Sequence, residues 1–484
     1  MERVLENCKP HNVFSFFEDL CQIPRETGNT AAVTKYLVDF AISRKLEYIC
    51  DEIGNVIIKK NASEGYNDHA PVILQGHTDM VCEKNYEQGG KHDFKKDPLN
   101  LAIMDDYLYA RGTTLGADDG IAVAYMLAIL DDNTLKHPPI EAVFTVDEED
   151  GMKGAIYLDT SVLEGRRMIN LDHEIEGELL TCCAGGSRVK LSLPADYITT
   201  KGTKYNLVIC GLNGGHSGLE INKGRGNANI LMGRLLLEIS KHIEYDLCDL
   251  RGGLTDSAIC RESKAEIMIS DSDIDIIEDC IERFKLGIEE EFNDTESNLT
   301  IYGENAGECE KDAVTDHCKR QILFLLNILP DGIIRLTHNG DDIVKTSSNA
   351  GIMKLDKDSF KLRINMRSLS EHEKRTLSDK MEYLITTIGG SYKVETDYPA
   401  WEYKEYSDIR DIAFDAFQDV FEHNPILTGF HAGLECGVFY EKIPNLDIVS
   451  FGPMIYDIHT PKERMNITSA AETYEFLLRI LSIC

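Results

Sequence analysis

The apolar residues in the first third of the chain follow two spacings, one typical of helices and the other of short buried strands. In order, the predicted elements are helices over residues 13–21 and 31–43, strands over residues 55–59 and 72–75, a helix over residues 120–130 and a strand over residues 140–146. Strands that alternate with helices in this way predict a largely parallel sheet with helices on both faces.

The pattern changes near residues 184–187, which read AGGS. Further on, strands are predicted over residues 188–193, 206–210 and 360–366, and helices over residues 227–242 and 274–292. Strands that alternate polar and apolar residues are typical of an antiparallel sheet with helices on one side. Beyond residue 400 the first pattern returns, with a helix over residues 409–421, a strand over residues 446–451 and a helix over residues 469–483.

These patterns predict two domains, one of which is discontinuous. We expect an α/β catalytic domain made of residues 1–186 and 400–484, with a mixed, mostly parallel sheet flanked by helices. An α+β domain of residues 187–399 is expected to interrupt it. A chain of 484 residues is too long for one simple core, which agrees with this division.

Composition narrows the classes of protein that fit. The 83 Asp and Glu against 50 Lys and Arg give a net charge of −33, which repels nucleic-acid phosphates and anionic lipid. The start of the chain lacks a secretory apolar core, and the longest apolar stretch, residues 121–130, is too short to cross a bilayer. The 14 cysteines include no CxxC pair, which favours scattered thiols in a reducing cytosol. We therefore expect a cytoplasmic protein with no nucleic-acid or membrane partner.

Histidine and carboxylate side chains cluster beyond several predicted strands and before one apolar helix, where an open parallel sheet collects its ligands. They are His77 and Asp79, Asp118 and Asp119, Glu148 and Glu149, Asp172, and His459. Each has an ordinary explanation on its own: adjacent aspartates can cap a helix, a run of acids can be a solvated turn, and a lone histidine can be structural. Together, two histidines and three carboxylates with a spare glutamate fit two zinc ions that share one bridging carboxylate.

Long ordered motifs carry a resemblance to a known family. They are GHTDMVCEKN at residues 76–85, GTTLGADDGIAVA at 112–124, TVDEEDGMKGA at 145–155, NLDHEIEGEL at 170–179, CAGGS at 183–187, GLNGGHSGLEINKGRGNAN at 211–229, HAGLECGVF at 431–439 and PMIYDIHTPKERM at 453–465. With these motifs spread over almost the whole chain, the sequence resembles the M20 metallopeptidase family and, within it, the aminoacyl-histidine dipeptidase branch.

The resemblance implies a set of metal ligands. One zinc ion would bind His77 and Asp172, the other would bind Glu149 and His459, and Asp118 would bridge both. Mixed carboxylate and imidazole sites also accept Co²⁺ or Mn²⁺, so the native metal stays open. The peptide bond that follows the bridging aspartate is implied to be cis.

The resemblance also implies how the site would act. Asp79 would orient the ring of His77. Glu148 would serve as the general base for a zinc-bridged hydroxide that attacks the peptide bond of a small peptide substrate.

The remaining candidates would contact the substrate. His216, in a glycine-rich turn, would stabilise the tetrahedral oxyanion from a lid that also forms a homodimer, acting within its own chain or across the dimer. Arg367 would clamp the C-terminal carboxylate of the substrate, with a surface ion pair as the alternative. Glu435 would lie near the free amine of the substrate, and His431 could be a core histidine.

The expected function is hydrolysis of dipeptides, including those that end in histidine, with broad specificity. One alternative is another amide hydrolase on the same scaffold, such as an N-acyl amino acid deacylase or a tripeptidase. The second is a non-enzymatic protein that binds metal or peptide, against which the intact Glu148 argues.

Overall fold

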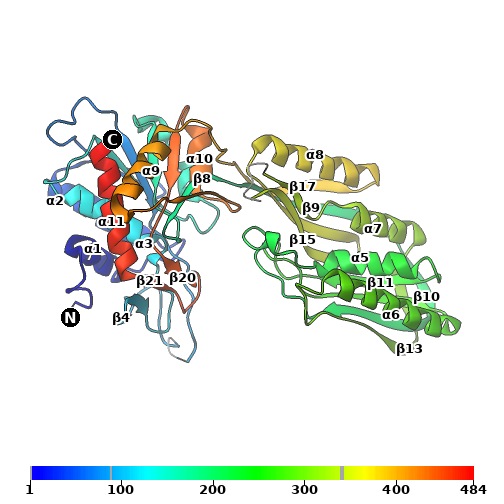
Figure 1. Cartoon of the computed structure of the whole chain (residues 1–484). Helices are drawn as coiled ribbons and strands as arrows, with labels where there is room; N and C mark the ends of the chain where they lie inside the picture. Colours follow the sequence, from blue (N-terminus) through cyan, green and yellow to red (C-terminus); the bar gives the residue numbers. More distant parts are fainter. Residues whose placement is uncertain (1–2, 88–89, 338–342) are drawn as a thin grey trace. The chain divides into compact units, whose positions relative to one another are not determined.

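The computed structural model describes residues 3–87, 90–337 and 343–484, which form two compact units (Figure 1). Unit 1 comprises Met1–Cys183, Trp401–Gly429 and Leu434–Cys484, and unit 2 comprises Ala184–Ala400 and Phe430–Gly433. Each unit has its own hydrophobic core. The predicted limits of the inserted domain, residues 187–399, and its role as a lid stay predictions.

The main sheet of unit 1 is mixed, as predicted, with strand order β1-β2-β6-β3-β7-β19-β8-β18. The strands are β1 Glu47–Cys50, β2 Val56–Lys60, β3 Val72–His77, β6 Ile140–Thr145, β7 Arg167–Asn170, β8 Glu178–Cys183, β18 Ile426–Phe430 and β19 Asp447–Ser450. The four neighbouring strands β6, β3, β7 and β19 pair in parallel, so their carboxyl ends meet at one edge. On both sides of these four strands the pairing becomes antiparallel, between β6, β2 and β1 on one side and between β19 and β8 on the other.

Helices cover the central strands of unit 1. They are α1 His11–Cys21, α2 Ala31–Arg44, α3 Ala117–Asp131, α4 Lys153–Tyr157, α9 Asp408–Phe421, α10 Glu435–Lys442 and α11 Ile467–Ile483. Every residue of β3 and of β6 is buried, so both faces of the sheet are covered at its centre. Burial on both faces explains why these strands appear in the sequence as continuous apolar runs.

The start of α3 lies so close to β3 that only glycine fits at position 76. A Cβ atom on Gly76 would fall 2.5 Å from Asp119 Oδ2 and 2.8 Å from the Cβ of Ala122. The same approach lets Asp119 Oδ2 accept a hydrogen bond of 3.1 Å from the backbone N–H of His77. The first turn of α3 is thereby held beside the carboxyl end of β3.

A smaller sheet of unit 1 joins distant parts of the chain. Its strands are β4 Leu101–Met104, β5 Tyr107–Ala110, β20 Ile455–Tyr456 and β21 Arg464–Asn466, in the order β20-β21-β5-β4. β5 leads into the segment that carries Asp118, and the loop between β20 and β21 carries His459. The pairing of β21 with β5 therefore ties together two segments that the sequence separates widely.

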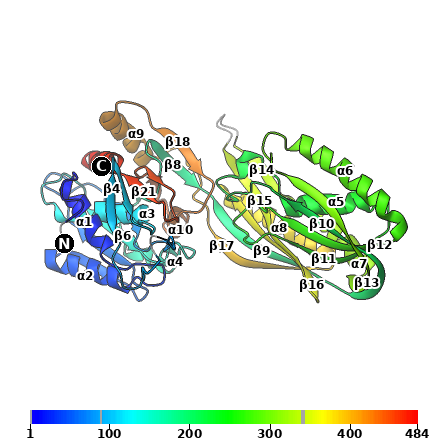
Figure 2. The same ribbon diagram turned by 90° about the horizontal axis from the view of Figure 1, so that it is seen from below.

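Unit 2 is built on an antiparallel sheet, as the alternating segments predict (Figures 1 and 2). The strand order is β13-β10-β12-β11-β15-β16-β9-β17, with β14 paired to β15. The strands are β9 Gly185–Pro194, β10 Tyr197–Cys210, β11 Asp246–Gly252, β12 Ser263–Ile269, β13 Thr300–Val314, β14 Gly332–Leu336, β15 Val344–Leu355, β16 Ser359–Ser368 and β17 Ser391–Tyr398.

The helices of unit 2 pack on one face of that sheet. They are α5 Ala228–Ile239, α6 Ile274–Glu291, α7 Asp316–Ile328 and α8 Glu371–Thr387. Alternate strand residues such as Val189, Leu191 and Leu362 share one core with these helices. Neighbouring residues such as Arg188 and Arg363 are exposed on the opposite face, which explains the alternation in the sequence.

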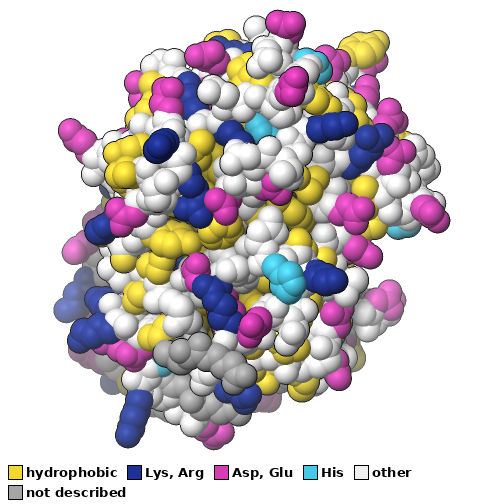
Figure 3. Space-filling view, turned by 90° about the vertical axis from the view of Figure 1, so that its left-hand side faces the viewer, with side chains coloured by type: hydrophobic (Ala, Val, Ile, Leu, Met, Phe, Trp, Pro, Cys, Tyr) yellow, Lys and Arg dark blue, Asp and Glu magenta, His cyan; other side chains and the backbone are white. Residues whose placement is uncertain are grey.

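Two features of the structure bear on the prediction that membranes and nucleic acids are not partners. Among the described residues, no helix is both long and apolar enough to span a bilayer. On the face of the molecule drawn in Figure 3, Lys and Arg side chains are interspersed with Asp and Glu side chains, and this face shows no continuous basic area.

Candidate metal centre

Asp118 lies between two imidazoles at the edge where the parallel strands of unit 1 end. Its Oδ1 is 3.1 Å from His77 Nε2, and its Oδ2 is 3.0 Å from His459 Nε2. Asp118 stands in the first turn of α3, and the peptide bond between Asp118 and Asp119 is cis, as the resemblance implied. One carboxylate thus faces two different histidines, which is the arrangement of a bridging ligand.

Two further carboxylates complete the cluster. His77 Nε2 is 3.6 Å from Asp172 Oδ1, and His459 Nε2 is 2.8 Å from Glu149 Oε1. One ligand atom each from His77, Asp118 and Asp172 lies within 4.8 Å of the others, and the same is true of Asp118, Glu149 and His459. The fold therefore brings together all five side chains that the sequence suggested as metal ligands.

The donor set fits divalent cations. His77 Nδ1 is 3.1 Å from the carbonyl oxygen of Asp79, while Nε2 faces the carboxylates of Asp118 and Asp172. Burial lowers the pKa of His77, but hydrogen bonds to Asp118 and Asp172 outweigh it and raise the pKa well above its ordinary value, so a proton on Nε2 bridges the ring to these carboxylates. A divalent cation can take the place of that proton, because imidazole nitrogen and carboxylate oxygen are both zinc ligands.

The electrostatics of the cluster agree with this fit. Burial lowers the pKa of His459, but hydrogen bonds to Asp118 and Glu149 outweigh it and raise the pKa to about 11. Burial raises the pKa of Asp118, but hydrogen bonds from His459 and His77 outweigh it and lower the pKa well below its ordinary value. The negative field that holds a proton on His459 equally attracts a metal ion.

Asp79 connects the end of β3 to the loop that follows β6. Its Oδ1 is 3.4 Å from His77 Nδ1 and accepts a hydrogen bond of 3.1 Å from the backbone N–H of Glu148. Its Oδ2 accepts a hydrogen bond of 2.9 Å from Thr27 Oγ1. Burial raises the pKa of Asp79, but the bonds to His77 outweigh it and lower the pKa. An ionised Asp79 can therefore fix the ring of His77 and the backbone of Glu148 together.

Glu148 lies beside the ligands, and its carboxyl group is in an unusual environment. Burial raises the pKa of Glu148 well above its ordinary value. His77 opposes this shift, whereas the carboxylates of Asp172 and Glu435 add to it. Ligand atoms of His77, Glu148 and Glu149 also lie within 4.8 Å of one another, so Glu148 can reach the same space.

Arg25 and Glu463 support the site, although no motif in the sequence indicated this role for them. Arg25 Nη1 donates to the carbonyl oxygens of Thr78 at 3.0 Å and of Asp79 at 3.1 Å, and Nη2 donates to that of Gly116. The Glu463 carboxylate accepts backbone N–H bonds from Leu115, Gly116 and Ala117 at 2.8–3.1 Å. Both side chains hold the backbone next to metal ligands. They lie far from those ligands in the sequence, so no motif or spacing indicates the contact.

Glu435 lies in the interior of unit 1 and has no exposed surface. Its Oε2 accepts hydrogen bonds of 2.5 Å from Gln75 Nε2 and 2.6 Å from Thr145 Oγ1, while Oε1 has no protein partner. Burial raises its pKa to about 7. The predicted role of Glu435 at the amine of a substrate stays a prediction.

His216, Arg367 and His431 form a separate cluster in unit 2. His216 Nδ1 accepts backbone N–H bonds from Gly218 at 3.3 Å and Leu219 at 3.0 Å, so the proton of the neutral ring is on Nε2. Burial and the nearby Arg367 lower the pKa of His216 to about 4 and that of His431 to about 3. Both rings are therefore neutral at pH 7.

Arg367 brings an uncompensated positive charge to this cluster. Its Nη1 donates to the hydroxyl oxygen of Tyr398 at 2.9 Å, while its buried Nε has no hydrogen-bond partner. His431 bonds to Ser347 Oγ through Nε2 at 2.8 Å and leaves Nδ1 without a partner. No carboxylate among the described residues forms an ion pair with Arg367, so the cluster suits an anionic ligand.

A mixed sheet that gathers imidazoles and carboxylates around one shared aspartate defines a class of metal-dependent enzymes. The chain belongs to peptidase family M20/M25/M40, whose family model matches residues 73–482. The family membership predicted from the motifs is thereby confirmed.

Individual relatives match over the whole chain. The chain is 33% identical over 479 residues to the cytosol non-specific dipeptidase of Escherichia coli (strain K12), covering 99% of this chain and 98% of that protein. The crystal structure of an aminoacylhistidine dipeptidase from Vibrio alginolyticus matches with a TM-score of 0.91 and 32% identity, covering 100% of this chain and 98% of that chain. A tripeptidase from Staphylococcus aureus, with a TM-score of 0.55, 17% identity and 98% coverage of both chains, shares the fold.

We expect Asp79→Asn to weaken metal binding by roughly 10- to 100-fold while the chain remains folded. The amide oxygen would still face the N–H groups of His77 and Glu148, but the neutral amide lacks the negative charge that strengthens both hydrogen bonds, so the ring would be held less firmly. Metal content after dialysis against graded chelator measures the loss, and circular dichroism checks the fold. Asp150→Asn, an exposed carboxylate in the same acidic run, is the matched control. Unchanged affinity in Asp79→Asn would show that Asp79 does not orient the ligand.

Proposed function

We propose that this protein hydrolyses dipeptides with two divalent metal ions, and that zinc suits the donor set best. One ion is assigned to His77 and Asp172, the other to Glu149 and His459, with Asp118 between them. The observation that carries the proposal is Asp118, whose two carboxylate oxygens face two different imidazoles. The named activities of the Escherichia coli and Vibrio alginolyticus relatives support dipeptides as the substrate class.

Glu148 is the proposed general base. When bound, the two ions polarise the scissile carbonyl and lower the pKa of a water ligand toward about 7. Asp79 holds the backbone of Glu148 at 3.1 Å, and the raised pKa of the Glu148 carboxyl makes it a stronger proton acceptor than an exposed glutamate. Glu148 takes a proton from the attacking water and returns it to the leaving amine.

The cluster in unit 2 is proposed to bind the substrate. The Arg367 guanidinium, which lacks a carboxylate partner among the described residues, pairs with the C-terminal carboxylate of the dipeptide. The Nε2–H of neutral His216 donates to the oxyanion that forms during attack. These two groups bind different oxygens, so they separate substrate recognition from stabilisation of the transition state.

The location and the assembly of the protein are also proposed. The Escherichia coli relative is named a cytosol dipeptidase, and we propose the same location here. Dimerisation through unit 2 is proposed from the family resemblance, and sedimentation of the purified chain tests it. A His216 that acts across such a dimer would require two copies for activity.

A panel of substrates tests the proposed function. We expect turnover of several unrelated dipeptides, including β-alanyl-histidine, and little turnover of tripeptides or N-acyl amino acids. In a tripeptide cleaved at its first peptide bond, the carboxylate that Arg367 would bind lies one residue further from the scissile bond than in a dipeptide. An N-acyl amino acid keeps that spacing but lacks the free amine that Glu435 is predicted to contact. Exclusive turnover of N-acyl amino acids or of tripeptides would contradict the proposal and favour the corresponding alternative hydrolase.

We expect Glu148→Gln to retain its metal and to lose about 10²- to 10⁴-fold in kcat. The amide preserves the size of the side chain but cannot accept the proton. Metal analysis and steady-state kinetics on the same sample separate the two effects. Full turnover in Glu148→Gln would remove this residue from the mechanism.

We expect Arg367→Lys to lower kcat/KM for dipeptides by roughly 10- to 100-fold, because a lysine loses the fork geometry that pairs with a carboxylate. Dipeptide amides lack that carboxylate, so the substitution should change their kcat/KM little. The control is Arg363→Lys, an exposed residue of the same strand whose Nε is 3.0 Å from Glu395. An equal fall for dipeptides and their amides would contradict the assignment of Arg367.

A further inference from the structure

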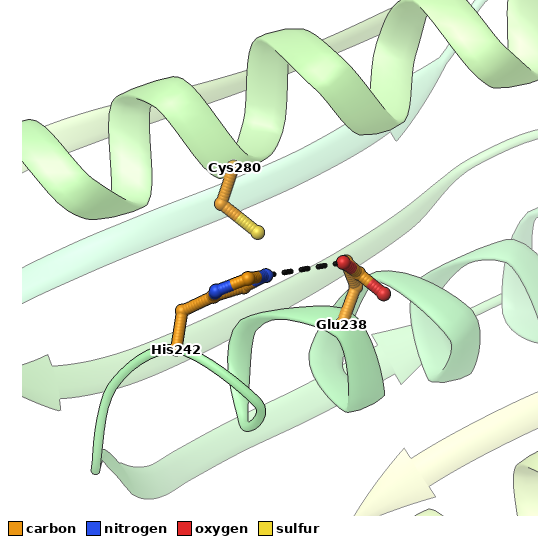
Figure 4. Close-up of side chains that lie close together, drawn as sticks. All are labelled: Glu238, His242 and Cys280. Carbon is orange, nitrogen blue, oxygen red and sulfur yellow. Dashed lines mark hydrogen bonds and ion pairs between the residues drawn. The ribbon is translucent and has the colours of Figure 1, made fainter.

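Unit 2 contains another group of metal-ligand side chains, which shares no residue with the candidate metal centre. It consists of Glu238 near the end of α5, His242 just beyond that helix, and Cys280 in α6 (Figure 4). One potential ligand atom of each residue lies within 4.8 Å of those of the other two. The group offers one oxygen, one nitrogen and one sulfur, which is a donor set that the site in unit 1 lacks.

The end of α5 places Glu238 and His242 on the same side of the chain. The helix ends at Ile239, and the turn continues because the backbone N–H of His242 donates to the carbonyl oxygen of Ile239 at 3.0 Å. His242 Nε2 is then 3.2 Å from Glu238 Oε1. The second oxygen, Oε2, accepts a hydrogen bond of 2.7 Å from Lys241 Nζ. One carboxylate oxygen therefore remains directed at the imidazole.

Cys280 approaches this pair from the neighbouring helix. The residue is 1% exposed and lies on the buried side of α6 with Ile277 and Ile281. In Figure 4 its sulfur points from α6 toward the ring of His242. Burial raises the pKa of the Cys280 thiol, and the Glu238 carboxylate adds to the shift. The thiol is thus protonated at pH 7 when no cation replaces the proton.

We propose that Glu238, His242 and Cys280 bind one divalent ion of the zinc type, with water as the fourth ligand. Thiolate, imidazole and carboxylate are the three ligand types that zinc takes in proteins. Around a tetrahedral zinc with bonds of about 2.0–2.3 Å, ligand atoms lie roughly 3.5 Å apart, which small side-chain rotations reach from the present spacing. The half-exposed His242 and Glu238 leave room for a water molecule.

A bound ion would clamp the end of α5 to α6. These two helices contact each other in the core of unit 2. The ion would add a link between His242 and Cys280, which lie far apart in the sequence. Binding would displace the proton of Cys280, so affinity should rise with pH. Lys241 and Arg283 lie near enough to favour the thiolate, and their positive charge would weaken the attraction of the site for the ion.

Titration of the full chain with Co²⁺, after removal of other metals, tests the proposal. A thiolate ligand gives Co²⁺ an intense near-ultraviolet charge-transfer band, whereas the nitrogen and oxygen ligands of the candidate metal centre give none. We expect a band that saturates at one thiolate-bound ion per chain, that Zn²⁺ abolishes, and that is lost in Cys280→Ser. Cys50→Ser, which removes an exposed cysteine of β1, should keep the band.

A second variant distinguishes loss of a ligand from loss of the fold. His242→Ala changes a half-exposed side chain and should weaken Co²⁺ binding at the band by at least 10-fold without altering circular dichroism. Zn²⁺ should also raise the Tm of the unsubstituted chain more than that of His242→Ala. The proposal is overturned if the unsubstituted chain gives no band or if the band disappears in Cys50→Ser. It is also overturned if the band is unchanged in Cys280→Ser or if Co²⁺ binding at the band is unchanged in His242→Ala.

Discussion

Negative charge gathered at one buried edge of the sheet is the constraint on which the arrangement of unit 1 depends. Asp118, Glu149 and Asp172 converge there, and carboxylates removed from water are stable only beside compensating positive charge. The imidazoles of His77 and His459 supply nitrogen donors but, when neutral, no charge. Two divalent ions satisfy both needs, which is why the same residues that would be unfavourable alone form a consistent ligand set.

The parts around this edge serve to hold backbone rather than to bind metal. Gly76 permits the close approach of α3, and the Glu463 carboxylate accepts three backbone N–H groups before the helix begins. Asp79 ties the ring of His77 to the loop of Glu148. Each contact restricts a ligand or its neighbour, so the geometry is set by many bonds of modest strength. A ligand placed in this way loses little freedom when an ion binds.

The two units present opposite electrostatic character. Unit 1 gathers carboxylates at its metal centre, whereas the cluster of unit 2 contains Arg367 and two neutral imidazoles without a carboxylate partner among the described residues. A dipeptide has a polarisable carbonyl and a carboxylate, which call for a metal ion and a cation respectively. The proposed division of labour follows from these two environments. Unit 2 also contains the proposed second metal site, in which a thiolate is one of the ligands: Glu238, His242 and Cys280.

The sequence by itself determined the type of most long elements and, through the motifs that resemble a known family, the five candidate ligands. Continuous apolar runs indicated β3 and β6 because both faces of these strands are buried, and the candidate ligands stood out because they come next to strand ends or a helix start. Long polar stretches of β10 and β13 gave no such signal, because their pairing with each other depends on backbone hydrogen bonds rather than on apolar residues. The sequence therefore predicted only the end of β10.

Only the tertiary structure decided which distant residues meet. Arg25 and Glu463 support the backbone around Asp118, and Cys280 approaches His242, through contacts between elements that no periodicity relates. The order of strands likewise came from the packing of whole elements, since each apolar run alone fits several neighbours. Short-range patterns record which faces a segment buries, whereas the identity of the partner on that face depends on the complete fold.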